Sequence, residues 1–519
     1  MTKAYDIIIA GGGHNGLVCA AYLAKAGKKV LVLEKNDIVG GAAITKEVFP
    51  GKSVSLCAQF LHQFNTRIAD DLKLSEFGLE FIDTDCRTSL LSNDGRHLTV
   101  SFDGQVEGDV AEDEVKAFQI LITRLQEFSE TLGFLADIPP IDIFDPDMQD
   151  KLSALKLGWK LRFGLGAEKM SDFLRIVGMN IYDLINEELE DDRLKALLSV
   201  DSVLGTHAGP RSPGTILTYL YRQIGGGKGR TLVPKGGMGA VSKAIAASAQ
   251  AKGADILTGM HVREVLIDNC RVVGLRTSCG TVYNAPIVVS NADPKTTVFD
   301  MVGSRHFEAD FVHRINTIRM RGNSCKLHLS LNSIPEFSGL GSEALAGRVV
   351  IADSADYVEN SFNPAKYNEW SSSPVIEFSI PTLNDPHLAE NGHVLSATIQ
   401  YAPYSLKGGW TDEAKEAFKN ICIDTLSRFA PSLKDSIEQS LLLTPVDLEN
   451  EIGMQGGNWH HGEFTLDQML MMRPVPLASR YALPLDGLFL CGAGAHPGGG
   501  VMGSAGRNAA NAILRGDKS

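Results

Sequence analysis

The chain has 519 residues, of which 44% are hydrophobic and 21% are charged, as in soluble globular proteins with room for two or three domains. Its formal net charge of −13 argues against nucleic acid as the main partner, because the phosphate backbone attracts basic surfaces. The sequence shows no secretory signal and no apolar run near the ~18 residues of a membrane span, so we expect a protein of the cytoplasm or of an organelle matrix.

The N-terminal segment "AYDIIIAGGGHNGLVCAAYLAKAGKKVLVLEK" predicts a strand–turn–helix–strand unit. Residues 5–10 and 29–33 have the unbroken apolar pattern of buried parallel strands. Leu17 and Leu23 lie on one face of the intervening helix, and Gly27 is placed to end it. This order of elements is typical of a dinucleotide-binding Rossmann unit.

The turn carries the G-x-G-x-x-G pattern of that unit in Gly11, Gly13 and Gly16. The first glycine permits the tight turn, the second lets a pyrophosphate approach the backbone, and the third lets helix and strand pack closely. Glu34 closes the second strand, where it can accept hydrogen bonds from ribose hydroxyls. We assign the remaining residues of the turn and the residue after the acid to the same site: Gly12, His14, Asn15 and Lys35.

The glycine fingerprint alone fits either FAD or NAD as the cofactor at this site. A glycine pair follows the acid at Gly40 and Gly41, before Ala42. This pair resembles the pattern of flavoproteins with two dinucleotide-binding domains, and the resemblance implies FAD.

The middle of the chain predicts the rest of a flavin domain. An alanine-rich helix and a strand are expected within residues 231–259. Alternating apolar residues then predict a small antiparallel meander that returns to a buried strand at residues 287–290. In flavoproteins of this kind the residue matching Val262 contacts adenine, although plain sheet packing explains this valine equally well.

A second glycine-rich loop, "GAGAHPGGGVMG", follows a short strand near the C-terminus and leads into a helix. Its last glycines fit G-x-G-x-x-G, but the chain ends before a second strand and acid can follow. We therefore predict that this loop holds the ribityl chain and ring of the same cofactor, with the positive helix end near the flavin pyrimidine. The residues assigned to it are Gly492, Ala493, Gly500, Val501 and Met502.

Four stretches, "GPRSPGTI", "PKGGMGAV", "GGNWHHGEFTLDQMLMMRP" and "GAGAHPGGGVMGSAGRNAA", resemble the phytoene desaturase-related FAD flavoproteins. They are most similar to the branch named after a pyridine nucleotide-disulphide oxidoreductase domain. That branch name does not suit this chain, because none of its eight cysteines forms a C-x-x-C pair. Many flavoproteins carry an acid that binds a ribityl hydroxyl where this chain has Ala493, so only backbone is available there.

The resemblance implies an α/β fold: a discontinuous Rossmann-type FAD domain (residues 1–65, 226–300 and 456–519) with an inserted substrate domain (residues 66–225 and 301–455). The first insertion is rich in amphipathic helix patterns. The second mixes strands such as "KLHLSLN" with the helix "TDEAKEAFKNICIDTLSRFA". We expect a mixed sheet covered by helices, with the flavin ring at the junction of the two domains.

Candidate reactive side chains gather near the C-terminus. His496 lies inside the second glycine loop, and His461 and Arg473 precede it. Each is a candidate for flavin or substrate contact, and each has an alternative structural role. His460, His461 and Glu463 could suggest a metal, but flavin hydride transfer needs none and we assign no metal site. Hydride removal from an unactivated C–H bond depends more on geometry than on a strong base.

Residues 151–165, "KLSALKLGWKLRFGL", predict an amphipathic helix. Leu152, Leu155, Trp159 and Phe163 form one apolar stripe, which Lys and Arg residues border. Such a stripe suits contact with a membrane surface, and an ordinary lid or core helix is the alternative.

The sequence therefore predicts a FAD-dependent oxidoreductase that transfers hydride from an apolar or amphipathic substrate to flavin N5. A redox-neutral flavin-dependent isomerase and a flavin-binding interaction protein with little turnover are the alternatives. Without a second nucleotide fingerprint, we expect electrons to leave to oxygen, a quinone or another protein rather than to NAD. The sequence leaves the oligomeric state open.

Overall fold

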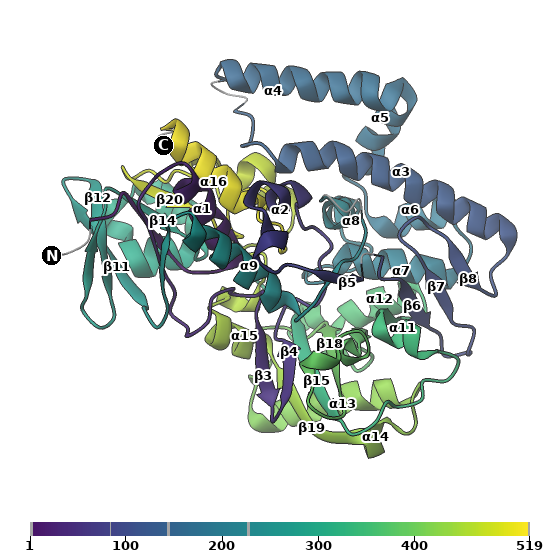
Figure 1. Cartoon of the computed structure of the whole chain (residues 1–519). Helices are drawn as coiled ribbons and strands as arrows, with labels where there is room; N and C mark the ends of the chain where they lie inside the picture. Colours follow the sequence, from purple (N-terminus) through teal and green to yellow (C-terminus); the bar gives the residue numbers. More distant parts are fainter. Residues whose placement is uncertain (1–3, 84, 143–145, 226–228, 517–519) are drawn as a thin grey trace.

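The computed structural model describes residues 4–83, 85–142, 146–225 and 229–516. Three distant parts of the chain form one parallel sheet in it (Figure 1). The sheet has the strand order β10-β2-β1-β14-β20, and every neighbouring pair is parallel. Its strands are β1 (Ile7–Ala10), β2 (Val30–Leu33), β10 (Asp255–Leu257), β14 (Ile287–Ser290) and β20 (Leu488–Leu490). β1 and β2 are buried throughout, which explains their unbroken apolar sequences.

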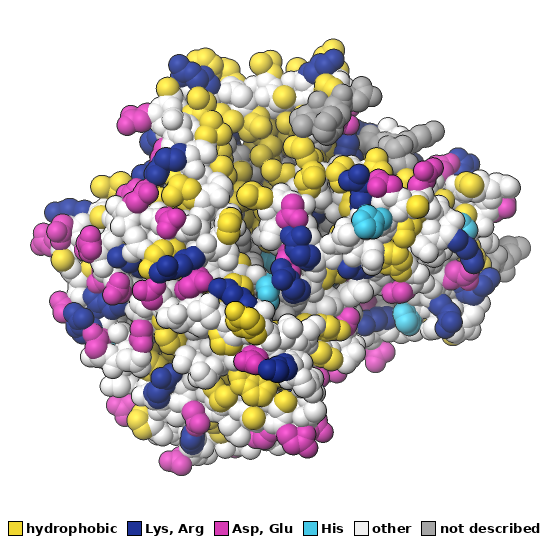
Figure 2. Space-filling view, turned by 180° about the vertical axis from the view of Figure 1, so that it is seen from behind, with side chains coloured by type: hydrophobic (Ala, Val, Ile, Leu, Met, Phe, Trp, Pro, Cys, Tyr) yellow, Lys and Arg dark blue, Asp and Glu magenta, His cyan; other side chains and the backbone are white. Residues whose placement is uncertain are grey.

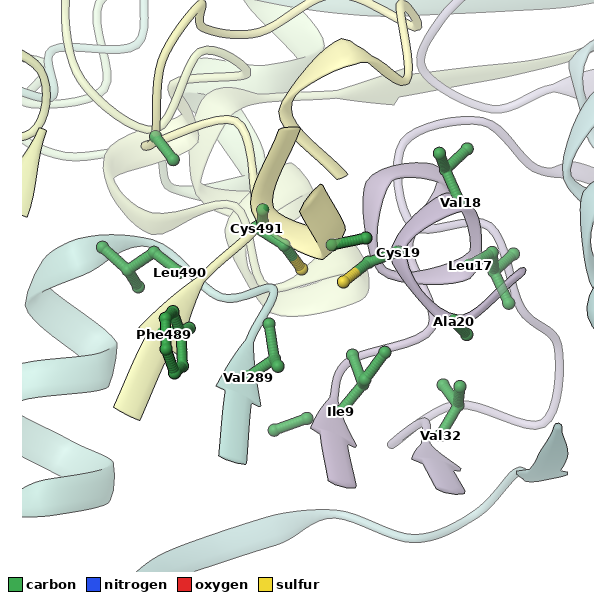
Figure 3. Packing of buried hydrophobic residues seen from close by; sticks show 14 of the residues in the cluster. Ile9, Leu17, Val18, Cys19, Ala20, Val32, Val289, Phe489, Leu490 and Cys491 are labelled. Carbon is green, nitrogen blue, oxygen red and sulfur yellow. The ribbon is translucent and has the colours of Figure 1, made fainter. Parts of the chain in front are cut away.

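Helix α1 (His14–Lys25) packs against both α9 (Met238–Ala251) and α16 (Ser504–Arg515). Figure 3 shows side chains of α1 above those of the parallel strands, with Leu17 and Ala20 near Ile9 and Val32. The predicted Rossmann unit is thus confirmed, with Gly27 in a left-handed conformation (φ 82°) after the C-cap residue Ala26.

The predicted antiparallel meander is also present beside this sheet. It consists of β11 (Val262–Asp268), β12 (Arg271–Thr277) and β13 (Val282–Asn284), and the chain then enters β14.

A second sheet of eight strands has the order β19-β15-β18-β17-β16-β6-β7-β8. All its pairs are antiparallel except β6 with β16. Its strands are β6 (Thr88–Leu91), β7 (Leu98–Val100), β8 (Val106–Gly108), β15 (Ser324–Leu331), β16 (Arg348–Ile351), β17 (Val375–Ser379), β18 (His393–Gln400) and β19 (Ile437–Leu443). The first insertion, expected to be helical, therefore supplies three of these strands.

The two faces of this sheet belong to two different apolar cores. Leu90 and Val350 face one core, whereas their strand neighbours Leu91 and Val349 face the other, as the two-residue period of a strand requires. The first core is shared with α3 (Glu112–Ala136), α6 (Ile181–Glu188), α7 (Asp192–Val203), α8 (Thr215–Gln223) and α12 (Ala355–Phe362). The second is covered by α11 (Ser342–Ala346), α13 (Asp412–Ser427) and α14 (Leu433–Ser436). The expected mixed sheet covered by helices is confirmed.

An arm of two helices lies over α3 at the top of Figure 1. It consists of α4 (Met148–Trp159), a π-helical turn (Lys160–Leu165) and α5 (Gly166–Ile176). Within the described ranges, no helix combines the length and apolar composition needed to cross a bilayer. The remaining helices and strands are α2 (Thr66–Leu72), α10 (Ala309–Asn316), α15 (Pro445–Ile452), β3 (Thr45–Phe49), β4 (Lys52–Ser55), β5 (Phe81–Asp83) and β9 (Val233–Pro234).

Candidate functional site

A cavity of about 1040 Å³ opens at the carboxyl ends of the parallel strands, where ligands bind in open α/β sheets. Its volume is at the upper end for small-molecule and cofactor sites. Eleven of the residues assigned from the sequence line it: Gly11, Gly13, His14, Asn15, Glu34, Lys35, Gly41, Ala42, Val262, His461 and Ala493. The structure thus brings together residues from both ends of the chain and from the meander.

The first glycine loop is shaped by close backbone contacts. A Cβ on Gly16 would lie 2.4 Å from the carbonyl oxygen of Gly11, which itself has a φ of 104°. Gly40 donates its N–H to the carbonyl of Gly12 (2.8 Å), and a Cβ on Gly41 would lie 3.3 Å from the Cα of Gly13. The glycine pair therefore lies against the fingerprint loop. Gly41 lacks room for a side chain beside Gly13, whereas a Cβ on Gly40 would lie 2.5 Å from the carbonyl oxygen of Ala43.

Helix α1 begins at this loop without a side-chain cap. Its N-cap is Gly13, so the first N–H groups and the positive end of the helix dipole face the cavity edge. This arrangement suits an anionic group such as a pyrophosphate.

Glu34 is buried, and each of its carboxylate oxygens is fixed by one backbone N–H. Oε2 accepts from Gly12 (2.7 Å) and Oε1 accepts from Asn36 (2.9 Å). Each oxygen keeps a second lone pair, so a held carboxylate can still accept from ribose hydroxyls. The same charge would repel the 2′-phosphate of NADP.

The second glycine loop lies against the first. His14 Nε2 is 3.1 Å from the carbonyl oxygen of Gly500, and burial lowers the pKa of His14 to about 4. The ring is therefore neutral at pH 7, and its N–H donates across the two loops. A Cβ on Gly506 of α16 would lie only 2.0 Å from the carbonyl oxygen of Asn15, so the two helices cross in close contact. Like α1, α16 begins at a glycine, Gly503, with no side-chain cap.

Several buried polar atoms at the cavity have no hydrogen-bond partner among the described residues. They are Asn15 Oδ1, Gln455 Oε1 and His461 Nδ1. Unsatisfied buried polar atoms are rare in native proteins, so these three fit a polar ligand that runs from the first loop toward His461. The residues present therefore fit a dinucleotide with a flavin end.

Other assigned residues lie outside the cavity lining. The first loop is packed tightly at Gly12, Gly16 and Gly40, on the side away from the cavity. In the second loop, a Cβ on Gly492 would lie 2.5 Å from the carbonyl oxygen of Asn291. The others outside the lining are Gly500, Val501, Met502, His496 and Arg473.

His496 and Arg473 are held by backbone groups. Burial lowers the pKa of His496 to about 4, and its Nε2 is 2.8 Å from the carbonyl oxygen of Leu135. The fully buried Arg473 guanidinium donates to the carbonyl oxygens of Ala493 (2.8 Å), Gln468 (3.0 Å) and His460. Arg473 thus ties the start of the second loop to the segment that precedes it.

The histidine pair has two different environments. His461 lines the cavity in a left-handed conformation (φ 54°), and burial lowers its pKa. His460 Nε2 accepts from the Trp459 indole (3.0 Å). Glu463 is paired with Arg319 and Arg321. Among the described residues, no group of three or more His, Cys, Asp or Glu side chains could hold a metal ion.

Asn291 is a cavity residue that the sequence analysis missed. Its side chain packs against Gly11, Gly13 and Gly16, and its carbonyl oxygen lies beside Gly492. It follows β14 directly, and its place at the carboxyl end of a parallel strand is the signal that could have identified it.

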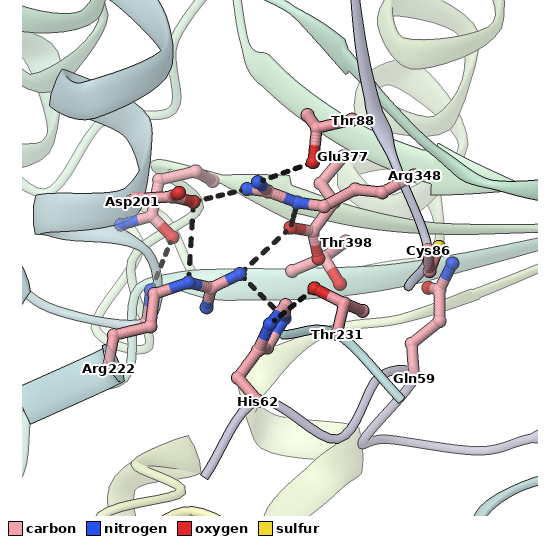
Figure 4. Close-up of polar contacts among 12 residues, drawn as sticks. Gln59, His62, Cys86, Thr88, Asp201, Arg222, Thr231, Arg348, Glu377 and Thr398 are labelled. Atoms are coloured by element: carbon pink, nitrogen blue, oxygen red, sulfur yellow. Dashed lines mark hydrogen bonds and ion pairs between the residues drawn. The ribbon is translucent and has the colours of Figure 1, made fainter. Parts of the chain in front are cut away.

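A buried polar network beside the eight-stranded sheet was also missed (Figure 4). Arg348 pairs with Glu377 and Asp201 (2.5 Å each), and Arg222 Nη2 lies 2.7 Å from His62 Nε2. His62 also meets Thr231 at 3.0 Å through Nδ1, and burial between cations keeps its pKa well below the usual range. His62 is therefore neutral, with its proton on Nδ1.

This network reaches the second glycine loop through adjacent residues. Tyr221, next to Arg222, donates its hydroxyl to the carbonyl of Gly499 (2.8 Å). Gln63, next to His62, donates to the carbonyl of Tyr221 (2.7 Å), and its side chain lies where a Cβ on Gly500 would be. The two domains thus meet at the loop assigned to the flavin.

The parallel sheet, the paired glycine loops and the adjoining eight-stranded sheet define a two-domain FAD flavoprotein of the amine oxidase type. The chain matches the flavin-containing amine oxidoreductase family over residues 16–514, and it belongs to that family. It is therefore a FAD-dependent oxidoreductase.

Similar proteins agree with this assignment. Pyridine nucleotide-disulfide oxidoreductase domain-containing protein 2 of Rattus norvegicus is 34% identical, with 98% of this chain and 93% of the rat protein aligned. Phytoene desaturase of Fusarium fujikuroi is 24% identical over 96% of this chain and 86% of its own length. These matches confirm the resemblance found in the sequence. Wild-type putrescine oxidase with bound putrescine has the same fold, with a TM-score of 0.61 and 16% identity over 99% of this chain and 100% of that one.

Proposed function

We propose that the protein is a dehydrogenase- or desaturase-type enzyme that acts on an apolar or amphipathic substrate. FAD, when bound, supplies N5 of its ring as the hydride acceptor. Glu34 and the N-terminus of α1 would hold its adenosine and pyrophosphate parts, and the loop after β20 would hold its ring. The relatives support this class, since one is named a phytoene desaturase.

The observation that supports the substrate class is a buried apolar cluster beside the second glycine loop. Tyr221, Phe464 and Met502 belong to one buried apolar cluster there, and the first two rings lie 4.0 Å apart. We propose that this cluster borders the substrate, because apolar surroundings would exclude water and hold an apolar C–H bond by shape, which suits hydride removal that depends on positioning. We propose His461 as the side chain that touches the cofactor or substrate, and His496 and Arg473 as residues that shape the loop.

Anaerobic mixing of the FAD-loaded enzyme with phytoene or with putrescine tests the substrate class. We expect phytoene to bleach the visible flavin absorption and putrescine to leave it unchanged. Bleaching by putrescine alone would assign amine oxidation. A changed double-bond geometry without net reduction would assign the isomerase, and no response to a wide set of ligands would favour a binding protein.

We also propose oxygen, a quinone or a protein as the electron acceptor. The two glycine loops meet each other, and the sequence has no further strand–glycine–helix–acid fingerprint for a nicotinamide nucleotide. In stopped-flow mixing, the photoreduced enzyme should be reoxidised by oxygen or a soluble quinone. Rapid reoxidation by NAD or NADP, with oxygen and quinone inert, would contradict this part of the proposal.

A further inference from the structure

The arm carries a continuous apolar stripe that the described part of the chain leaves exposed. Five large apolar side chains are more than half exposed: Met148 (71%), Leu152 (51%), Leu155 (69%), Trp159 (65%) and Phe163 (65%). Their spacing of four, three, four and four residues places them on one helical face. An exposed apolar row of this kind marks a contact surface.

The arm is anchored, so this exposure belongs to an ordered element. Asp147 and Asp150 form a capping box at its start, and Arg480 pairs with Asp150 at 2.9 Å. At the π-helical turn, Leu161 and Leu165 pack on the apolar core below. The Lys160 ammonium donates to the carbonyl oxygen of Glu130 (2.7 Å).

Charge next to the stripe favours an anionic partner. Lys151, Lys156 and Arg162 are exposed, and residues 151–165 contain no acidic residue although the chain carries a net charge of −13. A second copy that packed stripe against stripe would bring the same three cations face to face, where they would repel each other. An anionic bilayer offers both an apolar layer for the stripe and phosphates for the cations, whose stems can extend to the headgroups.

We propose that the arm docks the protein on the surface of an anionic phospholipid bilayer. Trp159 and Phe163 lie side by side, with ring centroids 5.6 Å apart, and aromatic rings favour the interface between headgroups and acyl chains. The stripe would lie in the plane of that interface, and no part of the chain need cross the membrane.

The position of the arm links membrane docking to the proposed function. This link rests on the proposal that the substrate is apolar. Figure 2 shows apolar side chains gathered on and below the arm, around a hollow. Leu132 and Val177, near the base of the arm, pack on the same apolar cluster that holds Phe464 and Met502. A bilayer bound at the arm would therefore place lipid-dissolved molecules next to the apolar cluster beside the second glycine loop.

Co-sedimentation of the FAD-loaded protein with vesicles tests the docking independently of turnover. We expect binding to vesicles of phosphatidylcholine and phosphatidylglycerol in equal parts, and weaker binding in high salt. Lys156→Glu with Arg162→Glu, and separately Trp159→Ser with Phe163→Ser, should each lower the partition coefficient at least about tenfold. Both variants should keep their flavin absorption and their activity on soluble substrates.

The matched control is Tyr367→Ser, which removes an isolated aromatic ring that is 74% exposed and should leave vesicle binding unchanged. Brominated acyl chains should quench the fluorescence of the wild-type protein but not that of Trp159→Phe. Equal vesicle binding by the wild-type protein and both double variants would overturn the proposal. So would a dimer in gel filtration that the Trp159→Ser, Phe163→Ser variant converts to a monomer, because the stripe would then cover a second copy.

Discussion

Gly13, the N-cap of α1, and Gly16, in the first turn of that helix, are glycines for different physical reasons. A Cβ at Gly16 would meet the backbone oxygen of Gly11 at 2.4 Å, so this position serves folding. A Cβ at Gly13 would meet the amide nitrogen of the Asn291 side chain at 2.6 Å. That side chain can move, so the protein can fold with a larger residue at position 13 while the pyrophosphate cannot enter.

Gly13→Val should therefore abolish FAD retention without unfolding the protein. Gly178→Ala is the matched control, because a Cβ there meets no atom within 4 Å. The ratio of flavin to protein absorbance after purification reports occupancy, and circular dichroism reports folding. Full flavin occupancy in the valine variant would refute the assignment of this loop to the cofactor.

His328 makes stability depend on pH. Burial in the eight-stranded sheet lowers its pKa from 6.5 to about 3, and Nδ1 bonds the Ser396 hydroxyl at 2.9 Å. Between pH 6.5 and about 3 the unfolded chain binds a proton here that the folded protein does not. The stability is thus full above pH 6.5 and falls as the pH drops.

Acidification from pH 7 to pH 5 should lower the free energy of unfolding by about 2 kcal/mol through His328 alone. This contribution of His328 can be measured by urea unfolding at both pH values. The wild-type protein and His328→Gln are compared, each with FAD bound. The variant should lose about 2 kcal/mol less than the wild-type protein on acidification. An identical loss in both proteins would show that His328 is not buried in its neutral form.

Helices α1 and α16 bring the two glycine loops together, and their crossing depends on Gly506. A Cβ at this position would lie 2.0 Å from the carbonyl oxygen of Asn15. Gly506→Ala should therefore push the helices apart, lower the free energy of unfolding by about 1–3 kcal/mol and weaken FAD binding.

Gly158→Ala in the exposed helix α4 gives the comparison, because a Cβ there meets nothing within 4 Å. It should stabilise the protein by up to about 1 kcal/mol through helix propensity. Thermal unfolding and FAD titration of both apoproteins would separate the two effects. Tighter FAD binding by Gly506→Ala than by the wild-type protein would contradict the proposed role of the crossing.

Sequence patterns predicted the elements whose signals are local. The Rossmann unit, the meander before β14 and the loop after β20 each carry their own glycine and apolar spacing. Strands β6–β8 were missed, because each has only three or four residues and is too short to show a periodic pattern. In addition, β6 pairs with β16 about 260 residues away, and no local signal marks such a partner. The Arg348–Glu377–Asp201 network was missed for the same reason, since it joins three separate elements.

The role of Arg473 was equally hidden in the sequence. A charged residue between two glycine-rich segments indicated chemistry, whereas its hydrogen-bond partners are backbone carbonyls such as that of Ala493. Carbonyl partners are independent of residue type, so the pattern around an arginine cannot reveal them. His461 did reach the cavity, and its contact with cofactor or substrate remains a prediction.

On the scale of the whole molecule, both ends of the chain meet at one cavity between the two domains. Segment 59–63 joins them: Gln59 donates to the Ser379 hydroxyl of the eight-stranded sheet (2.8 Å), and Leu61 bridges Leu232. Gln63 completes the junction at Gly500. We therefore propose that one extended ligand occupies both glycine loops.

The nucleotide content of the purified protein tests that claim most directly. Denaturation followed by chromatography of the released small molecules should give one FAD per chain and no nicotinamide nucleotide. FMN, or no flavin after reconstitution with FAD, would contradict the assignment of Glu34 and the first loop to the adenosine half. One FAD together with one NAD per chain would show that the two loops serve separate ligands.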